Sequence, residues 1–396
     1  MIDLALTNAR ILVDPGTRPF EGSLGVDGGK IVSVGPDVSE ARRTLDVEGR
    51  LVTAGLIDPH THLVFGGDRV PDFQRRLSGA TYQELAATGG GIRSTVAATR
   101  AARFDELKAS AARRMRWLAA NGATTVEVKS GYGLDTDHEL RMLAAARTAA
   151  GEVGMRLSTT LLPLHVVPSD SERGPYVDLV CNEMIPRAAA EGLADAVDVF
   201  IEDIAFTADE GRRCLEVARA HGLATKAHVG QFSDMGGARL AAAIGASSID
   251  HCEHVPASDA RALAEAGTVA VLVPGASLFL GDDHRPPVAA FRAEGVRMAV
   301  STDLNPGSSP LASLPLAAAL AVHRFGLTPE EALAGVTTHA AAALGASDRR
   351  GRIGVGYDAD LAVWDVESAI ELVYWLAAPL CHATVVGGTV HEWSSP

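Results

Sequence analysis

Residues 55–70 read GLIDPHTHLVFGGDRV, and in this stretch a short apolar run leads into His60 and His62. Residues i and i+2 of a β-strand point to the same face of the sheet. His-x-His at a strand end therefore directs two imidazole nitrogens toward one point. Two nitrogens are half of the four ligands that a tetrahedral metal site takes. The stretch predicts a strand that holds half of a metal site, provided that the rest of the chain supplies the other ligands.

Similar apolar, β-rich runs recur between about residues 53 and 353, where they alternate with Ala- and Arg-rich stretches of helical composition. Eight runs have the composition of buried strands: residues 56–62, 124–131, 156–165, 195–202, 224–230, 247–254, 269–275 and 297–303. Eight strand–helix units over about 300 residues are typical of a (β/α)8 barrel. We therefore predict an α/β fold with a TIM-like barrel as its main domain.

The two ends of the chain have a different pattern. Residues 1–52 alternate apolar and polar side chains between turn residues, and DGGK at 27–30 is typical of a hairpin turn. Residues 354–396 return to short strand-like runs, such as ATVVGGTVHEW at 383–393. We predict that both ends pair in one small β-sandwich domain, which divides the chain into residues 1–52, 53–353 and 354–396.

Composition limits the class of partner. The 396 residues carry a formal net charge of −14, which argues against nucleic acid or an anionic membrane as a partner. No run reaches the roughly 18 apolar residues of a membrane span. The amino terminus shows no signal peptide, and the four cysteines form no CxxC pair. We expect a soluble cytoplasmic protein that acts on a small molecule.

Polar side chains that suit a metal or a ligand follow the predicted strands. The carboxyl ends of barrel strands hold the active site in barrel enzymes. At these ends the sequence places His60, His62, Lys129, Tyr132, His165, Glu202, His228, Gln231, His251, Asp303, Asn305 and Ser308. Imidazole nitrogens with a single carboxylate suit Zn2+ or Fe2+, whereas Ca2+ and Mg2+ prefer oxygen ligands. The sequence predicts one divalent metal ion, zinc or iron, at the barrel mouth.

Several longer motifs are more specific than the single residues. They read DPHTHLVFGGDR (58–69), GGGIRSTVAATRAA (89–102), VEVKSGYGL (126–134), STDLNPGSSP (301–310) and TTHAAAALG followed by GRIGVGYDADLAVWD (337–365). With these motifs the chain resembles the amidohydrolase superfamily and, within it, the imidazolonepropionase family. That family hydrolyses 4-imidazolone-5-propanoate to N-formimino-L-glutamate in histidine degradation. The resemblance covers nearly the whole chain. We also expect the protein to form a homodimer.

The resemblance implies a role for each motif residue. Asp303 would carry the proton of the attacking water to the departing ring nitrogen, and His251 would stabilise the carbonyl oxygen as it becomes an alkoxide. The resemblance also implies a catalytic role for Gln231. The metal ligands would be His60, His62, His228 and Asp303. The substrate contacts would be Arg69, Tyr132, His165, Gln231, Asn305, Gly307 and Ser308, with the planar fork of Arg69 on the propionate.

Three departures from the family pattern leave the substrate open. Gln231 stands where the family often has Glu, and TTLLPLHVVP (159–168) and IEDIAF (201–206) also differ from it. One alternative is a sister amidohydrolase that acts on a related five-membered ring, such as an oxo- or thiohydantoin propionate. A non-enzymatic scaffold is disfavoured because all four expected ligands remain. A carbamylated Lys129 bridging two metal ions also stays open, as does the choice between zinc and iron.

Overall fold

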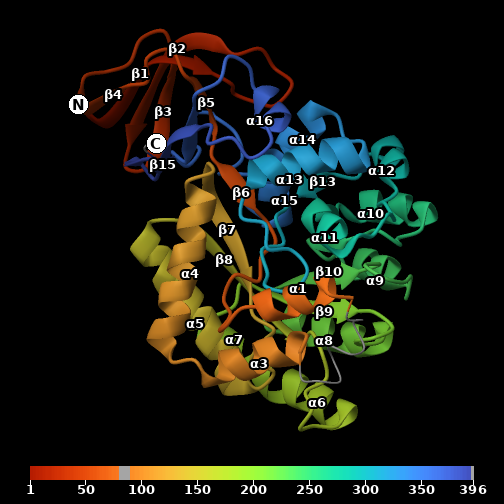
Figure 1. Ribbon diagram of the computed structural model, residues 1–396. Helices are drawn as coiled ribbons and strands as arrows, with labels where there is room; N and C mark the ends of the chain where they lie inside the picture. Colours follow the sequence, from red (N-terminus) through yellow and green to blue (C-terminus); the bar gives the residue numbers. More distant parts are fainter. Residues whose placement is uncertain (80–89, 394–396) are drawn as a thin grey trace.

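The computed structural model describes residues 1–79 and 90–393, so Gly89 of the GGGIRST motif and residues 394–396 lie outside it. Eight parallel strands form one sheet in chain order (Figure 1). They are β6 Leu56–Asp58, β7 Ala123–Lys129, β8 Arg156–Leu164, β9 Ala196–Ile201, β10 Ala224–Val229, β11 Ser248–His251, β12 Val269–Leu272 and β13 Met298–Val300. The sheet closes where His62 N donates to Leu304 O at 3.0 Å and Asp303 N donates to His60 O at 3.2 Å. The predicted (β/α)8 barrel is confirmed.

Helices follow the strands and surround the sheet (Figure 1). The connection from β6 to β7 contains α1 Val70–Leu77, α3 Ile92–Ala101 and α4 Phe104–Ala119. The later ones are α5 Thr136–Val153, α6 Arg173–Leu179, α7 Ile185–Ala190, α8 Ala208–Ala220, α9 Gly237–Ala243, α10 Ala260–Ala266, α11 Pro274–Leu280, α12 Val288–Glu294, α13 Leu314–Leu320, α14 Pro329–Gly335 and α15 Thr338–Ala343. Shorter turns are η1 Val180–Met184, η2 Ala257–Asp259 and η3 Ala321–Phe325.

Local sequence sets the ends of the longest helix. The Asp135 side chain accepts a hydrogen bond from His138 N at 2.9 Å and so caps the start of α5. Gly154 ends the helix with φ +78°, a left-handed conformation that costs glycine little. Apolar side chains such as Leu140, Leu143 and Ala146 lie on its buried face. Capping and one apolar face together place α5 against the barrel.

The first barrel strand is shorter than predicted. Strand β6 ends at Asp58, so His60 and His62 lie beyond it. Pro59 follows directly, and proline has no N–H group to donate to a neighbouring strand. Thr61 nevertheless forms a parallel bridge with Leu304, which keeps the segment extended. The two histidines therefore still project from an extended segment at the carboxyl end of the barrel, called the mouth below.

A separate eight-stranded sheet is built from both chain ends. Its strands are β1 Ile2–Ile11, β2 Phe20–Asp27, β3 Lys30–Gly35, β4 Ala41–Asp46, β5 Leu51–Ala54, β14 Leu361–Trp364, β15 Cys381–Val386 and β16 Thr389–Glu392. The two ends join where β5 pairs antiparallel with β14, and the short helix α16 Glu371–Tyr374 follows β14. Leu6, Leu24 and Leu361 are buried in its own core. The predicted β domain from both ends is confirmed.

This β sheet meets the amino end of the barrel (Figure 1). Gly55 is the single residue between β5 and β6, and a Cβ atom there would overlap the Thr124 side chain. The Trp364 indole is buried, and its Nε1 donates to Thr53 Oγ1 at 2.9 Å. The mouth thus lies away from the β domain. Within the described ranges, no helix combines the length and the apolar character needed to cross a membrane.

Candidate metal centre

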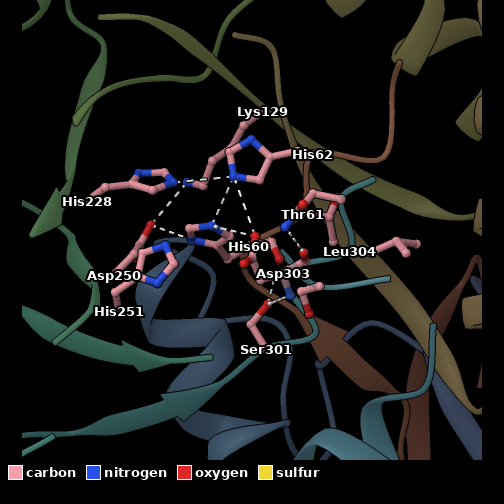
Figure 2. A network of polar contacts seen from close by, with 12 residues as sticks. His60, Thr61, His62, Lys129, His228, Asp250, His251, Ser301, Asp303 and Leu304 are labelled. Carbon is pink, nitrogen blue, oxygen red and sulfur yellow. Dashed lines mark hydrogen bonds and ion pairs between the residues drawn. The ribbon is translucent and has the colours of Figure 1, made fainter. Parts of the chain in front are cut away.

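Three histidine rings and one carboxylate converge at the mouth (Figure 2). His62 Nε2 lies 3.2 Å from His60 Nε2 and 3.3 Å from His228 Nε2. Asp303 Oδ1 lies 3.4 Å from His60 Nε2 and 3.6 Å from His62 Nε2. All four side chains are buried. The structure therefore brings together every residue that was predicted to be a metal ligand.

These atoms fit a divalent ion. Ligands about 2.0–2.1 Å from a tetrahedral zinc ion lie about 3.3–3.4 Å from each other, which is the spacing seen here. Asp303 Oδ2 is buried without a hydrogen-bond partner among the described residues, as is His62 Nδ1. Burial and the neighbouring rings of His60 and His228 lower the pKa of His62, so its ring is neutral. Three imidazole nitrogens and one carboxylate suit Zn2+ or Fe2+.

Two carboxylates behind the rings orient them. Asp250 Oδ2 lies 2.8 Å from His60 Nδ1, and Asp198 Oδ2 lies 3.0 Å from His228 Nδ1. At His60, a carboxylate hydrogen-bonded to Nδ1 favours the ring proton there and leaves the Nε2 lone pair free for a metal. At His228 the carboxylate lies within ion-pair distance of Nδ1 but not in hydrogen-bond geometry. Both Nε2 atoms point to the common centre, as this arrangement requires (Figure 2).

The backbone is unusual around the centre. Asp303 has φ +50°, and His251 and Cys252 have φ +81° and +78°. Such left-handed conformations are costly for residues other than glycine and often occur at functional sites. Buried Asp58 holds the strand end in place, because it accepts hydrogen bonds from the Ser301 hydroxyl and from Thr302 N. The Asp303 carboxylate is thereby held beside the histidines.

The residues predicted to bind the substrate lie on two sides of this centre. The ring centroids of His165 and Tyr132 lie 5.4 Å and 6.1 Å from that of His62. Burial lowers the pKa of His165 to about 4, so this ring is neutral at physiological pH. The ring of His251 lies 5.6 Å from that of His60. Gln231 follows β10, and its backbone N donates to Glu202 Oε2 at 3.1 Å.

Arg69 lies beside the loop that follows Asp303. Asn305 Oδ1 accepts hydrogen bonds from Gly307 N and Ser308 N, both at 2.8 Å. A Cβ atom at Gly307 would lie 3.6 Å from Arg69 Nη1 and 3.6 Å from Asn305 Oδ1. A cavity of about 420 Å3 adjoins these residues and is lined by Phe65, Arg69, Arg76, Asn305 and Gly307, among others. A guanidinium and a polar loop therefore share one side of the mouth.

The chain is similar to known proteins over nearly its whole length. The sequence model of the amidohydrolase family matches residues 51–390. An imidazolonepropionase of Caulobacter vibrioides is 50% identical over 398 residues, covering 98% of this chain and 99% of that protein. An imidazolonepropionase of Methylobacterium nodulans is 49% identical and covers 96% of this chain and 98% of that protein.

The chain belongs to the amidohydrolase family, and within it to the imidazolonepropionases. Solved structures show the same fold for this amidohydrolase. A triazine hydrolase variant superposes with a TM-score of 0.77 at 19% identity, covering 98% of this chain and 94% of that one. An atrazine chlorohydrolase from Arthrobacter aurescens, solved with zinc, gives a TM-score of 0.69 at 18% identity, with 98% and 94% coverage.

Sequence reasoning missed several polar residues of this amidohydrolase. Asp198 and Asp250 contact the ligand rings, and Glu127 lies behind them. Glu253 is buried, and neither carboxyl oxygen has a hydrogen-bond partner among the described residues, although Oε2 lies 3.9 Å from His251 Nδ1; burial raises the pKa of Glu253 to about 8. The sequence pattern could have indicated one residue of this set. Glu127 is two residues before Lys129, so the two side chains share a strand face. No sequence pattern indicated that Asp198 and Asp250 contact the histidines.

Proposed function

We propose that this amidohydrolase opens the ring of 4-imidazolone-5-propanoate by hydrolysis and releases N-formimino-L-glutamate, a step of histidine degradation. It is a hydrolase of carbon–nitrogen bonds in cyclic amides. Identity of 48–50% to curated imidazolonepropionases over nearly the whole chain supports the substrate. The observation that carries the chemistry is the convergence of three imidazole nitrogens and one carboxylate at the mouth.

His60, His62, His228 and Asp303 would hold one divalent ion. When bound, such an ion lowers the pKa of a water ligand to about 7 and so supplies a strong nucleophile at neutral pH. The Asp303 carboxylate would accept the proton of the attacking water and return it to the ring nitrogen as the carbon–nitrogen bond breaks. Its Oδ2 atom, which lacks a partner among the described residues, is available for this transfer.

Two further side chains act on the ring. His251 donates a hydrogen bond to the ring carbonyl oxygen as negative charge develops there, which stabilises the tetrahedral intermediate. Burial lowers the pKa of His251, so the ring is neutral and one of its two nitrogens is a donor. Gln231 contacts the ring through an uncharged amide, which can pair with both donors and acceptors.

The propionate group would bind on the side of the mouth opposite the metal centre. Arg69 uses Nε to contact Asp72 at 2.5 Å, which fixes the guanidinium and leaves nitrogen donors for a substrate carboxylate. Asn305, Gly307 and Ser308 form the polar loop next to it. Tyr132 and His165 line the wall nearest His62. The substrate would then span from the metal centre to Arg69.

A side-by-side assay tests the substrate. Metal-replete protein is given 4-imidazolone-5-propanoate, an oxohydantoin propionate and a thiohydantoin propionate, and kcat/KM is measured for each. We expect the imidazolone to be preferred by at least about tenfold, because 1.4 kcal/mol of differential binding gives that ratio. Preference for a hydantoin ring would assign the chain to the sister activity, with Gln231 as the first residue to examine.

One divalent ion per chain is expected. Elemental analysis of purified protein should give one equivalent of zinc or iron and so decide between the two metals. His60→Ala should lower the content to below about 0.1 equivalent after brief chelation, because it removes a ligand and its orienting contact with Asp250. Circular dichroism should remain that of a folded barrel, since stability comes from the packed strands rather than the mouth. Two equivalents in the parent protein would contradict the proposed site.

Three expectations from the sequence stay proposals. We propose a homodimer, a cytoplasmic location, and division of the chain into residues 1–52, 53–353 and 354–396. The β domain built from both ends supports this division in outline, although its strand β5 continues to Ala54 and β6 begins at Leu56, which places the first boundary at Gly55. The negative net charge supports a small-molecule substrate over nucleic acid.

A further inference from the structure

A buried carboxylate contacts the turn that carries Gln231. The Glu202 side chain lies at the mouth and is almost completely buried. Its Oε2 atom accepts hydrogen bonds from Gln231 N at 3.1 Å and from Phe232 N at 3.0 Å. Its Oε1 atom accepts a short hydrogen bond from the Ser233 hydroxyl. One side chain thus contacts three consecutive residues, which are called the Gln231 turn below.

Glu202 is itself held in place by its backbone. Strand β9 ends at Ile201, which pairs in register with Val229 at the end of β10. Glu202 therefore lies level with the point at which the chain leaves β10. Its N–H group donates to Phe206 O at 3.1 Å, and its carbonyl oxygen accepts a hydrogen bond from Ala205 N at 3.0 Å. The carboxylate is thus attached to a fixed point of the barrel.

The Gln231 turn begins sharply after β10. Gly230 has φ +61°, and a Cβ atom there would lie 3.0 Å from Val255 N, so the chain has little room at this point. The Phe232 side chain is 44% exposed, so packing of this ring contributes little to holding the turn. The Glu202 carboxylate is the acceptor that the structure shows for two successive N–H groups of the turn.

We propose that Glu202 is a positioning residue that fixes the Gln231 turn and so directs the Gln231 amide at the substrate ring. It acts through the turn and does not touch the substrate. Positioning of this kind has a large effect on rate, because a misplacement of about 1 Å can cost about 100-fold. The proposal deepens the function proposed above and rests on it, since it assigns the ring contact to Gln231.

The contacts of Glu202 favour positioning over proton transfer. A general acid or base needs an atom within hydrogen-bond reach of the proton that it transfers. Both Glu202 oxygens instead accept hydrogen bonds from the turn. None of these three partners carries a charge, so the buried carboxylate depends on their N–H and O–H groups for its stabilisation. The carboxylate and the turn therefore hold each other in place.

Two substitutions separate positioning from proton transfer. Glu202→Gln keeps the shape of the side chain: its amide oxygen accepts from the two backbone N–H groups, and its NH2 group donates to the Ser233 oxygen. Glu202→Ala removes all three contacts. We expect kcat/KM to fall about 10- to 100-fold in Glu202→Ala and less than about threefold in Glu202→Gln. Equal losses in both variants would overturn the proposal, because a proton carrier is lost in both.

A double-mutant cycle with Gln231→Ala tests whether the effect passes through Gln231. In the Gln231→Ala background, Glu202→Ala should lower kcat/KM by less than about threefold, because the side chain that it directs is already absent. Losses that multiply in full would show that Glu202 acts elsewhere, and the proposal would be wrong.

Asp360→Ala is the matched control. Asp360 is also a buried carboxylate that holds a turn, because its Oδ1 atom accepts a hydrogen bond from Gly387 N at 2.8 Å in the β domain. We expect this variant to lose stability toward denaturant. Its kcat/KM should stay within about threefold of the parent, because the β domain meets the amino end of the barrel and not the mouth.

Hydrogen–deuterium exchange gives a readout that needs no substrate. The peptide that covers residues 230–233 should exchange at least about tenfold faster in Glu202→Ala than in the parent or in Glu202→Gln, because two N–H groups lose their acceptor. Exchange at the rate of the parent would contradict the proposal. A parent that hydrolyses none of the three rings would instead refute the proposed function, and exchange would still decide whether Glu202 holds the turn.

Ser233→Ala keeps the question decidable if Glu202→Ala does not fold. This variant removes only the contact to Oε1 and leaves the carboxylate in place. We expect kcat/KM to fall about 3- to 10-fold, with faster exchange in the same peptide and almost no further loss in the Gln231→Ala background. Parent-like activity together with parent-like exchange in Ser233→Ala would refute the role of Glu202.

Discussion

Asp303→Asn is expected to lower kcat for ring opening by about 100- to 10,000-fold, the usual contribution of a general acid–base group. KM should change less than about threefold, because the groups proposed to hold the propionate are untouched. The amide keeps an oxygen that can face the metal, but it cannot take up a proton at neutral pH. Steady-state kinetics at saturating and limiting substrate separate the two parameters.

Metal content must be measured as well, because Asp303 Oδ1 lies 3.4 Å from His60 Nε2 and belongs to the proposed ligand set. A variant that keeps one metal equivalent and loses kcat identifies Asp303 as the proton carrier. Near-normal kcat with a raised KM would move that role to another residue. His251 would be the next candidate, because its ring lies 5.3 Å from that of His228.

Arg69→Met is expected to lower kcat/KM by roughly 30-fold to several thousandfold. A buried guanidinium–carboxylate contact costs about 2–5 kcal/mol when one partner is removed, and each 1.4 kcal/mol is a factor of ten. Arg69 is suited to such a contact because Asp72 and Thr95 hold its guanidinium beside the loop of Asn305 and Gly307. The same variant should lose the preference of the parent for the acid over its methyl ester.

Arg76→Met is the matched control. Arg76 lines the same cavity, but its Nη2 atom donates to Phe279 O at 3.2 Å rather than facing the loop of Asn305 and Gly307 through any recorded contact. We expect kcat/KM to fall less than about threefold and the acid preference to remain. The acid-to-ester ratio matters most, because a folding defect would weaken both substrates alike. If Arg69→Met leaves that ratio unchanged, the propionate is bound elsewhere and the proposed substrate loses its main structural support.

Alternation in the sequence was enough to predict the architecture. Apolar runs separated by helical stretches require parallel strands covered by helices, and eight of them close into a barrel. The meander at residues 1–52 and the short strands after 353 could only bury their apolar faces against each other, and β5 pairs with β14 as a result. The limits of strands were less predictable, because β6 ends at Asp58, directly before Pro59 and two residues before His60.

The proposed ligand set could also be predicted from the sequence, because the residue types that bind metals occur at the strand ends. The four residues are polar and lie at or just after the carboxyl ends of apolar strands: His60, His62, His228 and Asp303. Parallel strands bring these ends together at one mouth of the barrel. No packing detail is needed for that inference. Motif resemblance added the substrate side of the site, including Arg69 and the loop from Asn305 to Ser308.

Only the tertiary structure decided what surrounds these ligands. Asp250 is 190 residues from His60 in the chain, yet the two side chains lie 2.8 Å apart. Closure of the barrel brings the interior faces of its strands together, so that Lys129 meets Asp198 and Asp250 from other strands. Sequence alone cannot say whether such a lone aspartate faces the interior or solvent, because strand register and barrel closure are set by the packing of the whole chain. The proposed ligands could therefore be predicted from the local sequence, whereas the charged side chains that contact them could be identified only in the folded structure.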